Sequence, residues 1–309
     1  MDIPRGFTSR RSLLTAGLTA GGLIVVPPAA AYATRIEDPP VDPGDPTEPH
    51  HDVTQVTPED LVPPDGLDPG ACGSTIWQHN EILGFVTPYE PDGDGATNTF
   101  YYNAAFYNRI ETWFQFFRAN TPIAWGPPFQ IRTYGVYVNR GDGCSSYHNF
   151  GRAFDLSRIY ATDPATRTLH QVFNARYDQW RSQTGSTLTT TRKRYWATAA
   201  SVHYHFRSTL TYLYNTAHHN HIHFDNGVSG SGNTAFSSGS SAQVEHVQAC
   251  LVYVWGQSLA IDGIWGPQSS AAAGRVLTRI GRSGSLGTQS NWLEFNRATL
   301  RFGSGTQTY

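Results

Sequence analysis

The sequence carries little charge for its length. Of its 309 residues 15% are charged, and 22 Lys and Arg against 24 Asp and Glu leave a formal net charge of −2 at pH 7. No basic run occurs outside the N-terminal segment, so nothing in the charge pattern predicts a nucleic-acid partner. Aromatic residues reach 13% and glycine is plentiful, which is typical of a folded chain and not of charge-rich disorder.

Long hydrophobic runs are also missing. The apolar stretch at residues 14–26 is too short to cross a bilayer core of about 30 Å and is diluted by Gly and Thr. It follows a twin-arginine element, Ser9-Arg10-Arg11-Ser12-Leu13-Leu14, and leads to Ala31-Tyr32-Ala33, an A-x-A cleavage pattern. We therefore predict a cleaved twin-arginine signal peptide over residues 1–33. The mature protein is expected to lack a transmembrane segment and to be extracellular or associated with the cell wall.

Cysteine is scarce, and no C-x-x-C pair occurs, which disfavours a cysteine-ligated zinc site. An oxidising compartment allows one disulfide among Cys72, Cys144 and Cys250 and leaves one thiol over. We expect Cys72 to pair with Cys144, because both flank the central block of the chain, although spacing alone does not determine the pairing. Cys250 lies in an apolar helical pattern, which is typical of a buried small hydrophobic residue.

Composition divides the rest of the chain. Residues 34–71 are rich in Pro and Asp and predict a disordered spacer. Residues 228–241 are rich in Gly and Ser and predict a flexible linker. These breaks isolate a central domain at 72–227 and a smaller helical domain at 242–303.

Hydrophobic periodicity predicts an α+β fold for the central domain, with an antiparallel sheet and flanking helices. Aromatic and aliphatic residues at three- and four-residue spacing predict helices over 101–118, 169–181 and 195–215. Alternating patterns predict strands over 129–134, 153–156 and 221–225.

Two of these strands carry candidate metal ligands. His148 and Asp155 are seven residues apart across a turn that contains Gly151, and the alternation puts Asp155 on the face opposite Phe154 and Leu156. Taken alone, this pair is explained better by a polar turn with a hydrogen-bonded histidine than by a metal site.

A second element strengthens the metal hypothesis. His221 and His223 flank Ile222, so both imidazoles emerge on one face of a strand, together with Asp225. The alternative to a metal site is that these histidines face solvent on an edge strand. We predict that His148, Asp155 and His223 bind Zn²⁺ and leave a fourth tetrahedral position for water, as in catalytic zinc sites. His221 is then the candidate base for amide hydrolysis.

The motif Ser146-x-His148-x-x-Gly151-x-Ala153-x-Asp155 resembles that of the zinc D-alanyl-D-alanine carboxypeptidase family. His221-x-His223 resembles the H-x-H of the wider superfamily that includes lysostaphin-type peptidases and the hedgehog signalling domain, and bacterial extensin-like C-terminal domains share both elements. The resemblance implies a hedgehog or D-Ala-D-Ala-peptidase-like fold with His148, Asp155 and His223 as zinc ligands. It also implies that Arg132 binds the substrate's carboxylate or oxyanion, although a surface salt bridge explains Arg132 as well.

One position departs from the family pattern. Carboxypeptidases of this family have a Glu or Asp three residues before the last ligand as the general base, and here that position is Asn220. Either His221 takes over this role, as in lysostaphin-type members, or the protein binds zinc without strong catalysis.

Other histidines have simpler explanations. His203 lies on the apolar side of its predicted helix and is expected in the core. His205 lies off that face and is a possible second base. His218 and His219 are expected in a loop or as partners that orient a ligand.

The C-terminal block resembles the peptidoglycan-binding three-helix module. In Ile261-Asp262-Gly263-Ile264-Trp265-Gly266-Pro267-Gln268, the glycines allow a tight turn, Pro267 opens a helix and Trp265 anchors the loop. A generic helical appendage is the alternative.

Taken together, these patterns predict an exported zinc metallopeptidase, a carboxypeptidase or endopeptidase, that hydrolyses amide bonds of peptidoglycan stem peptides with a zinc-bound water. The expected partner is peptidoglycan or its stem peptides. A non-catalytic, extensin-like zinc-binding cell-wall protein is the main alternative, and a zinc hydrolase for another secreted substrate is a third.

Overall fold

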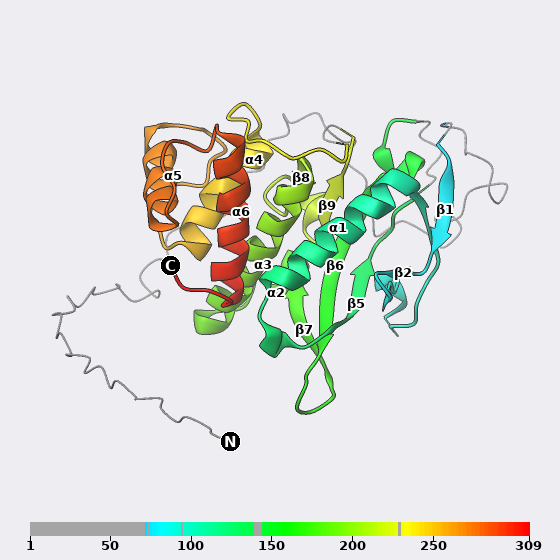
Figure 1. Cartoon of the computed structure of the whole chain (residues 1–309). Coiled ribbons are helices and arrows are strands. Elements are labelled where there is room, and N and C mark those ends of the chain that lie inside the picture. Colours follow the sequence, from blue (N-terminus) through cyan, green and yellow to red (C-terminus); the bar gives the residue numbers. More distant parts are fainter. Residues whose placement is uncertain (1–71, 73, 94, 139–143, 228–229) are drawn as a thin grey trace, which may run out of the picture.

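Figure 1 shows the computed structural model of the chain. It describes residue 72 and residues 74–309, apart from 94, 139–143 and 228–229. The predicted signal peptide at 1–33 and spacer at 34–71 therefore lie outside the described residues. None of the helices in the described part is long and apolar enough to span a membrane.

The chain folds into a mixed α+β structure built on a mostly antiparallel sheet. Its longest strand, β6 (Ala153–Thr162), pairs antiparallel with β5 (Pro128–Thr133), β7 (Leu169–Asn174) and β9 (Ile222–Asp225). The edge strand β8 (Ser208–Leu210) pairs with β9. The remaining strands are β2 (Glu81–Ile82), β3 (Phe85–Val86), which is parallel to β5, and a separate antiparallel pair of β1 (Ile76–His79) and β4 (Phe100–Asn103).

Two long helices, α1 (Ala104–Asn120) and α3 (Gly185–His205), pack on the sheet (Figure 1). Helix α1 begins where the Asn103 side chain accepts hydrogen bonds from the first free backbone amides. Its Trp113 ring lies 5.5 Å from Phe224 of β9, so the aromatic side of α1 covers the core face of the sheet. The chain before the C-terminal block also contains short helical turns: η4 (Glu90–Asp92), η5 (Ile123–Trp125), η6 (Tyr147–Phe150), α2 (Tyr177–Trp180) and η7 (Thr216–His218).

Several predicted elements agree with the structure. The strands at 129–134, 153–156 and 221–225 correspond to β5, the start of β6 and β9. The helix predicted over 101–118 is α1, which begins later because residues 100–103 pair with β1.

Two predicted helices were wrong in whole or in part. Residues 169–174 form β7, and only 177–180 are helical. The Asp163 side chain accepts from the amides of Ala165 and Thr166 and starts a turn, which returns the chain to pair with β6. Cross-strand pairing therefore outweighs the local helical pattern.

The helix predicted over 195–215 is displaced. Helix α3 starts at Gly185 and ends at His205, because Phe206 has extended backbone angles and Ser208–Leu210 pair with β9. The apolar residues beyond Phe206 that continued the helical period belong to a strand and loop instead.

Three helices occupy the C-terminal block, as predicted: α4 (Ser241–Ala249) with the π-helical extension η8 (Cys250–Val254), α5 (Pro267–Arg279) and α6 (Gln289–Ser304). Helix α6 lies along α3, where a Cβ added at Gly303 would be 2.5 Å from Ala197 Cβ (Figure 1). Buried side chains of both blocks form one continuous hydrophobic cluster. The C-terminal helices therefore complete the core over α3.

The cysteines behave as predicted. Cys72 and Cys144 form a disulfide, and Cys250 is a buried free thiol.

Candidate metal centre

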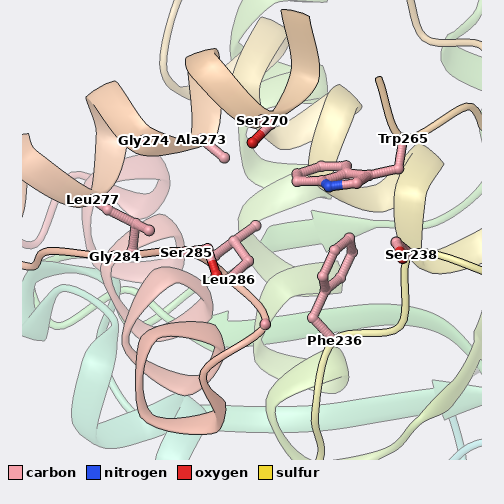
Figure 2. A pocket seen from close by; sticks show the side chains of 11 residues that line it. Phe236, Ser238, Trp265, Ser270, Ala273, Gly274, Leu277, Gly284, Ser285 and Leu286 are labelled. Atoms are coloured by element: carbon pink, nitrogen blue, oxygen red, sulfur yellow. The ribbon is translucent and has the colours of Figure 1, made fainter. Parts of the chain in front are cut away.

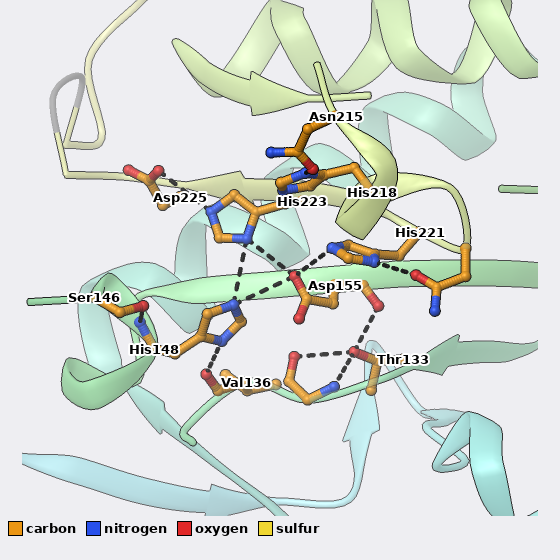
Figure 3. Close-up of polar contacts among 12 residues, drawn as sticks. Thr133, Val136, Ser146, His148, Asp155, Asn215, His218, His221, His223 and Asp225 are labelled. Atoms are coloured by element: carbon orange, nitrogen blue, oxygen red, sulfur yellow. Dashed lines mark hydrogen bonds and ion pairs between the residues drawn. The ribbon is translucent and has the colours of Figure 1, made fainter. Parts of the chain in front are cut away.

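The centre is built on the pairing of β6 with β9. This register places Asp155 directly opposite His223, with Phe154 opposite Phe224 and Leu156 opposite Ile222. The apolar residues are fully buried on the core face, so Asp155 and His223 emerge together on the other face (Figure 3). The alternation predicted for both strands is confirmed.

His148 reaches the same face from η6. The Ser146 side chain accepts from the His148 amide, and the Asn149 side chain accepts from the Ser146 amide, which together form a capping box. The turn ends at Gly151 in the left-handed region with φ of 63°, where a Cβ would come within 3.0 Å of backbone atoms of β4. The serine and the glycine of the motif thus hold the turn that presents His148.

Three ligand atoms converge on one point. His148 Nε2 lies 3.3 Å from His223 Nδ1 and 3.3 Å from Asp155 Oδ1, and His223 Nδ1 lies 3.0 Å from the same carboxylate oxygen. All three residues are buried. Among the described residues, this is the group of histidine, cysteine and acidic side chains whose geometry could hold a metal ion.

The tautomer of a neutral His148 leaves two acceptors facing each other at this point. Its Nδ1 lies 2.6 Å from the Val136 carbonyl oxygen, which can only accept, so the proton of a neutral His148 is on Nδ1 (Figure 3). The lone pair of Nε2 then faces the carboxylate of Asp155, which is also an acceptor. A proton or a metal ion between the two acceptors removes this conflict, and the donor set fits a metal.

Asp155 is held in the charged form that a metal ligand needs. Burial alone would raise the pKa of this carboxyl, but the charges that His148 and His221 carry when they are protonated, with hydrogen bonds from protonated His148 and from His223, hold the pKa well below its usual value.

His221 lies beside the group and not within it. Its Nε2 is 3.4 Å from Asp155 Oδ1, and its Nδ1 is 2.7 Å from Asn220 Oδ1. Because the amide oxygen of Asn220 can only accept, this contact assigns the proton of a neutral His221 to Nδ1 and leaves the Nε2 lone pair toward the centre. The ring of Tyr134 lies 6.1 Å from the His221 ring on the same side.

Further residues around the centre were missed by the sequence analysis. The side chain of Thr133 donates to the Asp155 carbonyl oxygen, and Asn215 Oδ1 lies 2.7 Å from His218 Nδ1. The His218 ring is 5.0 Å from that of His221 and 6.0 Å from that of His223, so of the two alternatives for His218 the structure favours a residue beside the candidate ligands. No sequence signal marks the Val136 carbonyl, because any residue supplies one.

Asp225 lies at the end of β9, on the far side of His223. Its Oδ2 is 3.6 Å from His223 Nε2, an ion-pair distance too long for a hydrogen bond, while its Oδ1 accepts from the Gly227 amide.

Arg132 makes its contacts away from the three ligand atoms. Its guanidinium donates to Gln130 Oε1 and lies over the Tyr160 ring at 4.9 Å from the centroid. Two other histidines also lie elsewhere. His203 is fully buried in the core, as predicted, and His205 packs against Phe116 at a centroid distance of 5.0 Å.

The structure therefore brings His148, Asp155 and His223 together from separate parts of the chain, in a buried group that could bind a metal ion, and places His221 beside this group. Comparison with known proteins does not assign the chain to a family: no family model, no curated protein and no solved structure matches it.

Proposed function

We propose that the metal is zinc, held by His148 Nε2, Asp155 Oδ1 and His223 Nδ1. Zinc–ligand bonds of about 2.0–2.1 Å in a tetrahedron separate neighbouring ligand atoms by roughly 3.3 Å. The three separations here are 3.0, 3.3 and 3.3 Å. Two imidazoles and one carboxylate are a donor set that zinc accepts, and three protein ligands leave one position open. This convergence, with His221 Nε2 beside it, is the observation that carries the proposal.

The activity that we propose is hydrolysis of amide bonds in peptidoglycan stem peptides. Zinc, when bound, acidifies a coordinated water toward a pKa of about 7 and polarises a carbonyl group. His221 receives the proton of the attacking water at Nε2 and returns it to the leaving amine nitrogen. Asn220 holds the Nδ1 proton of His221, so that Nε2 remains the acceptor.

The cell-wall setting of this proposal rests on the sequence. Residues 1–33 carry the twin-arginine pattern for export, and residues 261–268 resemble the loop of a peptidoglycan-binding module. The hedgehog or D-Ala-D-Ala-peptidase-like fold is proposed on the motif Ser146 to Asp155 and His221-x-His223, and the β6–β9 pairing supports it. A module that binds the polymer would raise the local concentration of the hydrolase at its substrate. Arg132 is proposed to contact the substrate's carboxylate, which requires it to leave its present partner Gln130.

A second candidate function is favoured by one residue. Asn220 cannot accept a proton usefully, and a site with zinc but no effective base would belong to a non-catalytic, extensin-like cell-wall protein. The two candidates share the metal and differ only in turnover.

The experiment that separates them uses the purified mature protein, zinc and isolated peptidoglycan, with the products identified by mass spectrometry and bound zinc measured by elemental analysis. Peptidase activity releases shortened stem peptides from the wild type. The variant His221→Ala is expected to keep zinc and lose turnover, whereas His148→Ala loses the metal. His170→Ala is the matched control, because His170 lies in β7 and contacts Asp163.

Stoichiometric zinc with no cleavage by the wild type would reject the peptidase and leave the non-catalytic protein. Full activity of His221→Ala would remove His221 from the mechanism. Absence of zinc binding by the wild type would reject both candidates.

A further inference from the structure

A cavity lies in the C-terminal block, away from the metal centre. It has a volume of about 200 Å³ and is lined by residues of α5, of the loop at 284–287 and of the segment at 236–238, together with Trp265 (Figure 2). This volume is smaller than the roughly 300–1,000 Å³ of pockets that enclose drug-sized ligands, so the cavity suits a ligand the size of a single ring. None of its eleven lining residues is charged, which argues against a phosphate, a carboxylate or a cationic ligand.

One wall of the cavity is aromatic and fixed from behind. The indole of Trp265 is partly exposed and meets Phe236 edge to face at 4.7 Å, and Phe236 in turn lies 5.6 Å from Trp292. Trp292 is fully buried, and its Nε1 donates to Thr234 Oγ1 at 2.8 Å. The wall is therefore anchored in the core before any ligand arrives, which lowers the entropic cost of binding.

The opposite wall is kept open by a glycine within a helix. Gly274 lies in α5, where glycine costs about 0.5–1 kcal/mol relative to alanine. Neither packing nor backbone requires it: a Cβ added there would meet no atom within 4 Å, and its φ is not in the left-handed region. Gly274 lines the cavity, and because glycine has no side chain, the space beside it stays open.

Hydroxyl groups surround this space. Ser238, Ser270 and Ser285 line the cavity and are exposed, and in the described part of the chain no hydrogen bond occupies their side chains. A flat indole beside unpaired hydroxyls suits a ligand with one apolar face and neutral hydrogen-bonding groups around its edge. A sugar ring in the chair form has this character.

We propose that this cavity binds one neutral sugar ring of a glycan, with the apolar face of the ring against Trp265 and its hydroxyls toward the serines. The site does not depend on the metal or on peptidase activity. If the protein acts on the cell wall, the cavity would hold the glycan strand while the metal centre acts on the peptide.

The test measures binding to the full mature protein in a chelating buffer, by isothermal titration calorimetry and NMR chemical-shift changes. The ligands are a β-1,4-linked tetramer of N-acetylglucosamine and a β-1,4-linked tetramer of glucose. The variant Gly274→Leu puts a side chain into the cavity, and Ala271→Leu puts the same side chain on an exposed position of α5 that does not line it. Leucine is a good helix former, so Gly274→Leu is expected to be at least as stable as the wild type.

Wild type and Ala271→Leu are expected to bind, and Gly274→Leu to bind at least tenfold more weakly. Binding of the acetylated tetramer alone identifies an amino-sugar polymer, and binding of both identifies a general β-1,4-glycan site. Absence of binding to both tetramers would overturn the proposal, as would wild-type affinity in a folded Gly274→Leu. Because the measurement uses no metal and no turnover, a failed peptidase assay leaves it unaffected.

Discussion

His223 Nδ1 lies 3.0 Å from Asp155 Oδ1, and the two residues are direct cross-strand partners of β9 and β6. Their meeting is therefore a consequence of strand register. A shift by one residue would turn both side chains into the core and bring out Phe154 and Phe224. The aromatic packing of the core face, with Trp113 and Phe106 against Phe224, thus keeps the candidate metal ligands together on the other face.

The first prediction concerns the charge of Asp155. Asp155→Asn keeps the size of the side chain and removes the negative charge that would bind the proposed zinc ion. We expect zinc affinity to fall by roughly 100-fold or more, since even partners that only orient a ligand contribute about 10–100-fold. Competition with a chromophoric chelator measures the affinity. Asp163→Asn, in the turn between β6 and β7, is the matched control and should bind zinc as the wild type does. Wild-type affinity in Asp155→Asn would mean that Asp155 is not a ligand.

The second prediction concerns Asn220 as a positioning residue. Asn220→Ala removes the acceptor 2.7 Å from His221 Nδ1 and leaves zinc bound. We expect a mixture of His221 tautomers, visible in the ¹⁵N shifts of the ring by NMR, and a kcat roughly tenfold lower with little change in KM. Asn220→Asp restores an acceptor and should restore the single tautomer. An unchanged tautomer in Asn220→Ala would show that another group orients His221.

The third prediction is a loss of stability in acid, caused by two buried histidines between α3 and the C-terminal helices. The rings of His203 and His246 stack at 3.8 Å, and in the described part of the chain neither ring nitrogen of His203 has a hydrogen-bond partner. Burial lowers the pKa of His246 from 6.5 to about 4, although its hydrogen bond with Asn296 opposes this. Burial and the nearby His246 lower the pKa of His203 further below its usual value.

Because the folded state disfavours the protonated form, this stability is complete above the unfolded pKa of 6.5 and is lost as the pH falls toward 4 and below. His246 alone contributes on the order of 3 kcal/mol over that interval. Urea denaturation at several pH values measures it. His246→Gln should have a shallower dependence on pH between 6.5 and 4, whereas His170→Gln in β7 should follow the wild type. Equal slopes for wild type and His246→Gln would exclude this origin.

The fourth prediction concerns the contact between α6 and α3. A Cβ at Gly303 would lie 2.5 Å from Ala197 Cβ and 3.2 Å from the Lys193 carbonyl oxygen, so Gly303→Ala must push the helices apart. We expect a loss of about 1–3 kcal/mol in the free energy of unfolding, measured by denaturant titration. Gly274→Ala, where a Cβ meets nothing, should instead stabilise by about 0.5–1 kcal/mol. A neutral Gly303→Ala would show that the helices are loosely packed.

The local elements of the centre could be predicted because each depends on neighbours in the chain. The alternation around Asp155 and His223 identifies strands with one apolar face, and the serine and glycine around His148 hold a turn that needs no distant partner. Predictions failed where pairing with a distant segment determined the secondary structure. Residues 169–174 have a helical pattern and yet form β7 because β6 offers a strand to pair with.

The sequence by itself determined which side chains can bind a metal, that Asp155 and His223 turn away from the core, and that Cys250 is buried. Only the tertiary structure decided that these groups meet. The register of β6 and β9 and the Val136 carbonyl that orients His148 depend on contacts between separate segments. Such contacts form when core packing brings the segments together, and no local pattern encodes their distances.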